Sequence, residues 1–182
     1  MPLSWEDEVT ITRRELMRAH ASLRLEETRN AGLPPLPAAD SPKAYAALQA
    51  PAVPTLMAFL RDKRFLTVEP WMERALLERA PGYAPPATRN FFAQGNHRDP
   101  LPLWSHALHW FDNGRFRFAP NPSPIRRTPL LYNVWMSRSE GMATALEEWL
   151  MQAGLYDNRP RGREIVWTML AARAARGLGN LY

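Results

Sequence analysis

The chain has 182 residues, of which 46% are hydrophobic and 23% are charged, and it contains no cysteine. This length allows one domain with a buried core, and the lack of cysteine excludes disulfides, thiolate metal ligands and a thiol nucleophile. No apolar run approaches the ~20 residues of a membrane-spanning helix, and the N-terminus is too charged for a signal peptide. We therefore expect a cytoplasmic protein with no membrane partner.

The formal net charge of +5 raises the question of nucleic-acid binding. The positive charge comes almost entirely from arginine, since Lys43 and Lys63 are the two lysines. The arginines are mixed with acidic residues and form no run longer than a pair. A phosphate-binding surface is therefore disfavoured, and an arginine-driven nucleic-acid binder with salt-sensitive affinity is kept as the third alternative.

Helical patterns dominate the first eighty residues. Ser4, with Asp7 three positions later, forms a capping-box pattern that predicts a first helix ending at about Asn30. Prolines at helix starts predict three shorter helices, which begin at Pro42, Pro54 and Pro70. We interpret residues 1–80 as a helical scaffold.

A long irregular segment follows at residues 81–96, where prolines, glycines and two phenylalanines show no helical periodicity. Loops of this length inside compact domains are often functional. A short helix is predicted next, from about Leu101 to Phe111, with Asn113-Gly114 as its end. The four residues after that glycine alternate like a short strand.

Two histidines lie on this predicted short helix. His106 and His109 are three positions apart, so their side chains share one face. A helix that binds a metal ion commonly supplies two imidazole ligands one turn apart, and a carboxylate from another helix typically completes the ligand set. The spacing is not the usual four of zinc-peptidase helices, and no glutamate follows either histidine. A histidine pair without a metal therefore remains the alternative.

The stretch from Pro129 to Gln152 is apolar on every side, which predicts a long central helix around which an all-α fold is built. Two of its charged residues, Glu140 and Glu147, lie two helical turns apart and share a face. Because a buried carboxylate needs a counter-charge, a metal ion or water, this face is a candidate site. The alternative is that Ser137 and Glu140 form a capping box at a helix start.

The run from residue 140 to 176, EGMATALEEWLMQAGLYDNRPRGREIVWTMLAARAAR, resembles the C-terminal region of the domain-of-unknown-function 885 family. The pattern of that family is roughly EGWALYAE, then a helix ending in GLYD, then a helix finishing in RAAR. Further back, GYAPPATRNFF resembles the substrate-side loop of the family, and PLPLWSHALHW lies where the family has HExxPGHHLQ. Arg126-Arg127 looks like its arginine pair. The resemblance covers about residues 81–182.

This resemblance implies a helical, zinc-dependent peptidase of carboxypeptidase type, related to the gluzincins, that acts on a peptide or small-molecule substrate. Glu140 would be the third zinc ligand, beside His106 and His109. Arg126, Arg127 and Tyr132 would face the carboxylate of the substrate, since a guanidinium binds a carboxylate through two hydrogen bonds.

The chain also departs from the family pattern. The catalytic glutamate that follows the first histidine has no match, because Arg98 follows His97 and Ala107 follows His106. Family members are also much longer, so we expect a fragment, a shortened relative or a degenerate copy. Two hypotheses remain, a metallopeptidase-like hydrolase with His97 or Asp99 near the metal, and a catalytically inactive helical binding or scaffold module.

The expected organisation is one compact helical domain with long proline-rich loops. Its two parts are the scaffold of residues 1–80 and the loop plus metallopeptidase-like helical region of residues 81–182. A homo-oligomer, or partner segments that are missing from this chain, are open alternatives for its assembly.

Overall fold

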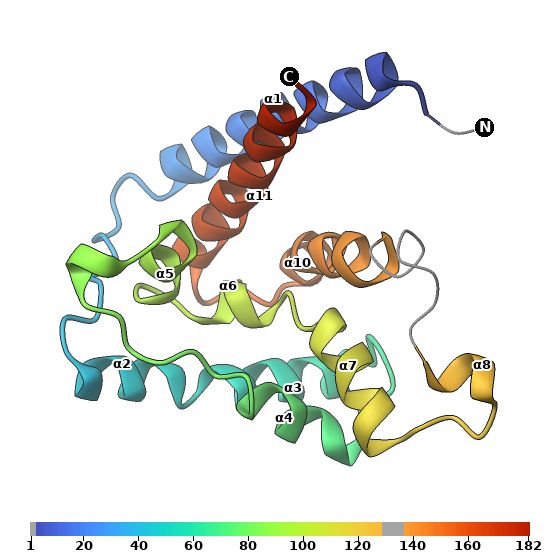
Figure 1. Cartoon of the computed structure of the whole chain (residues 1–182). Helices are drawn as coiled ribbons and strands as arrows, with labels where there is room; N and C mark the ends of the chain where they lie inside the picture. The colour runs from blue at the N-terminus through green and yellow to red at the C-terminus, as the bar shows by residue number, and fades with distance from the viewer. Residues whose placement is uncertain (1–2, 129–136) are drawn as a thin grey trace. The chain divides into compact units, whose positions relative to one another are not determined.

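The computed structural model describes residues 3–128 and 137–182 (Figure 1). Within these ranges the regular structure is helical and no strand occurs, which confirms the all-α class predicted from the sequence. No helix in these ranges combines the length and the apolar character needed to cross a bilayer. The chain divides into two compact units, of which unit 1 comprises Met1–Leu36 with Tyr156–Tyr182 and unit 2 comprises Pro37–Leu155.

Unit 1 is a pair of helices from the two ends of the chain, α1 (Trp5–Arg29) and α11 (Pro160–Leu181) (Figure 1). They run in opposite directions, since Asn30 just after α1 donates a 2.8 Å hydrogen bond to Glu164 near the start of α11. Because the first and last helices pack together, the division into units differs from the boundary near residue 80 that the sequence suggested.

Polar contacts fix both ends of α1. At its start, Ser4 and Asp7 each accept a hydrogen bond from the backbone N–H of the other, so the predicted capping box is confirmed. Near its end, the buried carboxylate of Glu26 lies 3.1 Å from the Arg29 guanidinium and 3.0 Å from that of Arg163 in α11. A buried carboxylate is tolerated when it is paired and hydrogen-bonded in this way.

Unit 2 contains the shorter helices. They are α2 (Pro42–Gln49), α3 (Ala52–Asp62), α4 (Pro70–Leu77), α5 (Phe91–Asn96), α6 (Leu101–Trp104), α7 (Leu108–Phe118), α8 (Pro124–Arg127) and α10 (Met142–Gln152), with a 3-10 turn at Pro86–Thr88 and a π-helical turn at Ser137–Gly141. Fully buried leucines from four of these helices lie in the core: Leu56 and Leu60 in α3, Leu76 in α4, Leu101 in α6 and Leu150 in α10.

The segment predicted as one helix from residue 101 to 111 is two helices, α6 and α7, joined by a turn at residues 105–107. Helix α7 runs on through Gly114, so the predicted helix end there and the predicted strand after it are wrong. A Cβ atom at Gly114 would lie 2.8 Å from the Cβ of Ala75 and 2.9 Å from the ring of Trp71. The glycine therefore allows α4 and α7 to pack closely.

The predicted central helix is described over its C-terminal part, where the π-helical turn continues directly into α10. Its predicted start at Pro129 falls in residues 129–136, which lie outside the described residues. Met142 is 40% exposed and Trp149 is 48% exposed. This part of the helix is therefore buried on one side, whereas the sequence pattern suggested burial all round.

Gly114→Ala is expected to destabilise the protein. Overpacking of a tight contact costs about 1–3 kcal/mol, and alanine regains up to roughly 1 kcal/mol of helix propensity. Gly179→Ala in α11 is the matched control, because no atom lies within 4 Å of a Cβ added there. Urea unfolding followed by circular dichroism should give a lower free energy of unfolding for Gly114→Ala only. Equal stability of the two variants would contradict the packing role of Gly114.

Candidate metal centre

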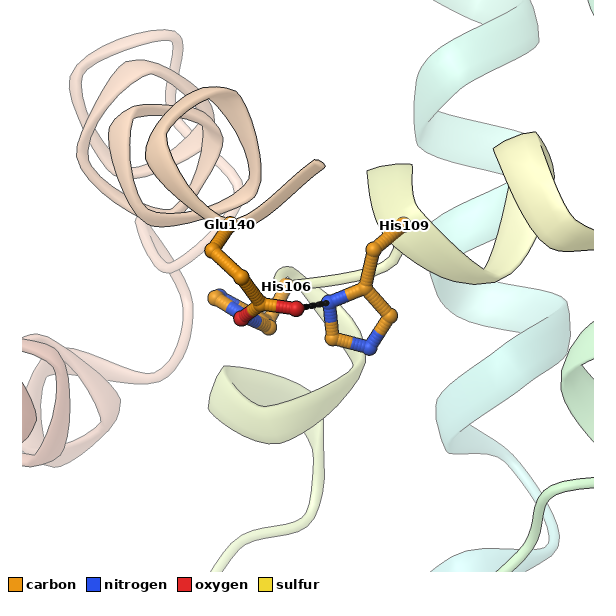
Figure 2. A group of neighbouring side chains, drawn as sticks. All are labelled: His106, His109 and Glu140. Atoms are coloured by element: carbon orange, nitrogen blue, oxygen red, sulfur yellow. Dashed lines mark ion pairs between the residues drawn. The ribbon is translucent and has the colours of Figure 1, made fainter. Parts of the chain in front are cut away.

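Two histidines and a glutamate of unit 2 converge where α7 meets the helix of residues 137–152 (Figure 2). The Nε2 atom of His106 lies 3.5 Å from Oε2 of Glu140, and the Nδ1 atom of His109 lies 3.5 Å from Oε1 of the same carboxylate. One ligand atom from each residue lies within 4.8 Å of the others. These three side chains can therefore hold a metal ion, as the sequence predicted.

The histidines are presented by the turn between α6 and α7. His106 lies in the turn and His109 in the first helical turn of α7, so the two do not share one continuous helix as predicted. The His106 N–H donates to the carbonyl of Leu103 at 3.1 Å, and the hydroxyl of Ser105 donates to the carbonyl of Pro102 at 2.7 Å. These bonds fix the turn, and the two imidazole rings lie 4.7 Å apart between centroids.

Glu140 is presented by the π-helical turn before α10. Such turns are rare within helices and occur frequently at functional sites. The side chain of Glu140 is 51% exposed, whereas those of His106 and His109 are 9% and 11% exposed. The cluster therefore has a buried imidazole side and an open carboxylate side. Contact with both imidazoles favours the ligand interpretation of Glu140 over the capping-box alternative.

A second carboxylate of the same helix lies behind His106. Oε1 of Glu147 is 2.7 Å from Nδ1 of His106, and the Glu147 side chain is fully buried. The two atoms are close, although they do not form a regular hydrogen bond. The prediction that Glu140 and Glu147 share a face is confirmed, because they reach the two nitrogens of one imidazole.

The donor set suits a transition-metal ion. Two imidazole nitrogens and one carboxylate oxygen are a common set of three protein ligands, which leaves a fourth position open. In a tetrahedral site with metal–ligand bonds of about 2.0–2.1 Å, neighbouring ligand atoms are roughly 3.4 Å apart. The two oxygens of Glu140 each lie 3.5 Å from a nitrogen of one ring, and one ligand atom from each of the three residues lies within 4.8 Å of the others. The side chains would therefore have to draw closer together to hold one ion.

His97, which the sequence suggested near the metal, is a structural residue. Its Nδ1 lies 2.7 Å from the carbonyl of Ala93, and its Nε2 accepts a hydrogen bond from the N–H of Ala84 at 3.1 Å. Its ring stacks on Tyr45 with 4.1 Å between centroids. Both ring nitrogens of His97 thus contact the backbone, and His97 is not a member of the metal-binding group.

Asp99, the other residue suggested near the metal, is also buried. Its Oδ1 accepts a 3.0 Å hydrogen bond from the N–H of Leu101, at the start of α6. This carboxylate therefore helps to begin the helix that leads to His106, and it is not a member of the metal-binding group.

A buried polar network around Tyr45 was not anticipated from the sequence. The Tyr45 hydroxyl accepts hydrogen bonds from Gln49, at 2.6 Å, and from Asn96. Gln49 in turn accepts from the indole N–H of Trp104 at 3.0 Å. Burial raises the pKa of the Tyr45 hydroxyl above its ordinary value. Since Trp104 directly precedes the turn that carries His106, the network anchors one side of the candidate site.

The roles of Arg126 and Tyr132 as substrate-facing residues are not tested by the structure and stay predictions. Arg126 lies on the exposed helix α8, so its guanidinium is accessible. Tyr132 lies outside the described residues.

No family model, no curated protein and no solved structure matches this chain. The resemblance to the domain-of-unknown-function 885 family therefore stays a prediction that depends on the quoted residues. The fold and the cluster define an all-α protein with a His-His-Glu group that can hold a metal ion.

Tyr45→Phe is expected to destabilise the protein by about 1–3 kcal/mol, because the amides of Gln49 and Asn96 lose a buried acceptor. Tyr83→Phe is the matched control, since the Tyr83 hydroxyl donates to the carbonyl of Asp40 at an exposed position. Chemical unfolding should show a clearly larger loss for Tyr45→Phe. Similar losses for the two variants would mean that the Tyr45 network does not stabilise this part of unit 2.

Proposed function

We propose that this protein is a zinc-dependent hydrolase that binds its metal ion through His106, His109 and Glu140. The convergence of two buried imidazoles and one carboxylate is the observation that carries the proposal. Zinc is favoured because this donor set, in a chain without cysteine, is typical of catalytic zinc sites with three protein ligands.

The side chains have separate roles in this proposal. His106 and His109 would hold the ion through largely buried imidazoles, and Glu140 would contribute negative charge from a half-exposed side chain. A zinc ion held in this way supplies Lewis acidity and activates water at neutral pH. The exposed side of Glu140 is then the direction from which a substrate approaches.

The proposed substrate is a peptide with a free C-terminal carboxylate. This choice follows from the family resemblance, in which an arginine and a tyrosine face the carboxylate. Arg126 is accessible for that role, and a planar guanidinium binds a carboxylate through two parallel hydrogen bonds. The role of Tyr132 is proposed from the resemblance alone.

A metal-holding module without catalytic activity is the second candidate. No glutamate follows either histidine to act as a general base. Glu147 faces Nδ1 of His106, and Asp112, one turn beyond His109, lies 3.8 Å from Arg115. Among the described residues at the cluster, the carboxylates are thus engaged as a ligand candidate or as partners of other side chains.

Protein purified without chelators is expected to bind one zinc ion per chain. Binding should raise the unfolding free energy by about 2.7 kcal/mol when free zinc is roughly 100 times its dissociation constant. Elemental analysis and thermal unfolding measure both effects. His109→Ala and Glu140→Gln should abolish them, and His20→Ala should not, because His20 lies at an exposed position of α1. Full zinc binding by His109→Ala would refute the assigned ligands.

The zinc-loaded protein is expected to release C-terminal residues from unblocked peptides and to leave amidated peptides intact. Mass spectrometry of a peptide mixture measures the products, and a zinc chelator should stop their formation. Arg126→Ala should raise KM for unblocked peptides, because the substrate carboxylate loses its guanidinium partner. Stoichiometric zinc with no turnover would favour the inactive module. No zinc and no turnover would refute both candidates.

A further inference from the structure

The second carboxylate at the candidate metal centre has no role in the proposed ligand set. Glu147 lies in α10 and its side chain is fully buried. Removing an ionised carboxylate from water costs several kcal/mol unless it is paired. Its Oε1 lies 2.7 Å from Nδ1 of His106, so the carboxylate is directed at the back of a candidate metal ligand.

The geometry of one imidazole ring connects the two carboxylates. Nδ1 of His106 faces the buried Glu147, and Nε2 of the same ring faces the half-exposed Glu140 at 3.5 Å. A neutral imidazole carries its proton on one nitrogen and offers a lone pair on the other. A carboxylate beside Nδ1 stabilises a proton at Nδ1, and the lone pair is then at Nε2.

We propose that Glu147 is a positioning residue, which keeps His106 in its Nδ1-protonated tautomer and directs the Nε2 lone pair at the metal ion. The metal part of this inference rests on the proposed function, whereas the tautomer is a property of the metal-free chain. The Nδ1 atom and the carboxylate are close but do not form a regular hydrogen bond in this structure. Such contacts often tighten when a site is occupied.

The helix geometry explains why one helix can supply both groups. Glu140 and Glu147 are seven residues apart, which returns the second to the face of the first and separates them by about 10 Å along the axis. One imidazole fits between the two carboxylates. The two carboxylates differ in solvent exposure, since an ion from solvent can reach Glu140 and cannot reach Glu147. We therefore assign the ligand role to Glu140 and the positioning role to Glu147.

The tautomer of His106 can be measured without any metal. Nitrogen chemical shifts of the four imidazoles, at about pH 8.5 where free imidazole is neutral, distinguish protonation at Nδ1 from protonation at Nε2. His97 is an internal reference for the Nδ1 proton, because its Nδ1 faces a carbonyl and its Nε2 accepts a backbone N–H. His20 is the exposed reference. We expect His106 to match His97, and to move toward His20 in Glu147→Leu.

Zinc affinity provides the second readout, by competition with a chromogenic chelator. Glu147→Leu should weaken zinc binding by roughly 10–100-fold, the effect of losing an outer-shell partner. Glu147→Gln should weaken it less, because the amide oxygen still accepts the Nδ1 proton. Glu148→Gln, at the next position of α10 and only partly buried, is the matched control and should leave the tautomer and the affinity unchanged.

The outcomes separate this inference from the proposed function. Protonation of His106 at Nε2 in the wild-type protein overturns the inference, as does a Glu147→Leu variant with unchanged tautomer and zinc affinity. A wild-type protein that binds no zinc refutes the proposed function, and the tautomer still decides the role of Glu147. If Glu147→Leu does not fold, the wild-type tautomer and the Glu147→Gln affinity decide it.

Discussion

The contact on which the candidate site depends is that between the imidazole of His106 and the buried carboxylate of Glu147. A fully buried acid in a largely apolar helix would be strongly unfavourable without a partner. The helix of residues 137–152 lies against α7, and its Glu147 reaches His106 in the turn between α6 and α7. Once this contact forms, Glu140, two turns earlier on the same face, is brought to the other nitrogen of the ring and to His109.

The rest of unit 2 keeps this turn in place. Helix α3 packs against α4 and α6, and α4 packs against α7 through the close approach at Gly114. The hydrogen bonds from Trp104 to Gln49 and from Gln49 to Tyr45 fix the end of α6 just before the turn. The site thus consists of two largely buried imidazoles and a half-exposed carboxylate, which would draw together around a metal ion.

Sequence patterns predicted those structural features that depend only on residues close together in the chain. The capping box of Ser4 and the shared face of Glu140 and Glu147 follow from side-chain type and helical spacing. The grouping of Glu140 with the two histidines was expected from the family resemblance, and the contact between Glu147 and His106 was not predicted. The turn at residues 105–107 and the continuation of α7 through Gly114 depend on packing against α3 and α4, which no local pattern contains. The same holds for His97, whose partners Ala84 and Tyr45 are distant in sequence, and for the pairing of α1 with α11.

The choice between hydrolase and binding module depends on proton transfer. The cluster supplies a metal-binding group, and the contact between Glu147 and His106 gives that group a defined orientation. General acid–base groups contribute typically about 10²–10⁴-fold to a hydrolytic rate, and the described carboxylates at the cluster are already engaged. A hydrolase built on this cluster alone would therefore be slower by about that factor than one with a dedicated base. A rate near that of ordinary metallopeptidases would require a further group, brought to the open side of Glu140 by the substrate or by another part of the chain.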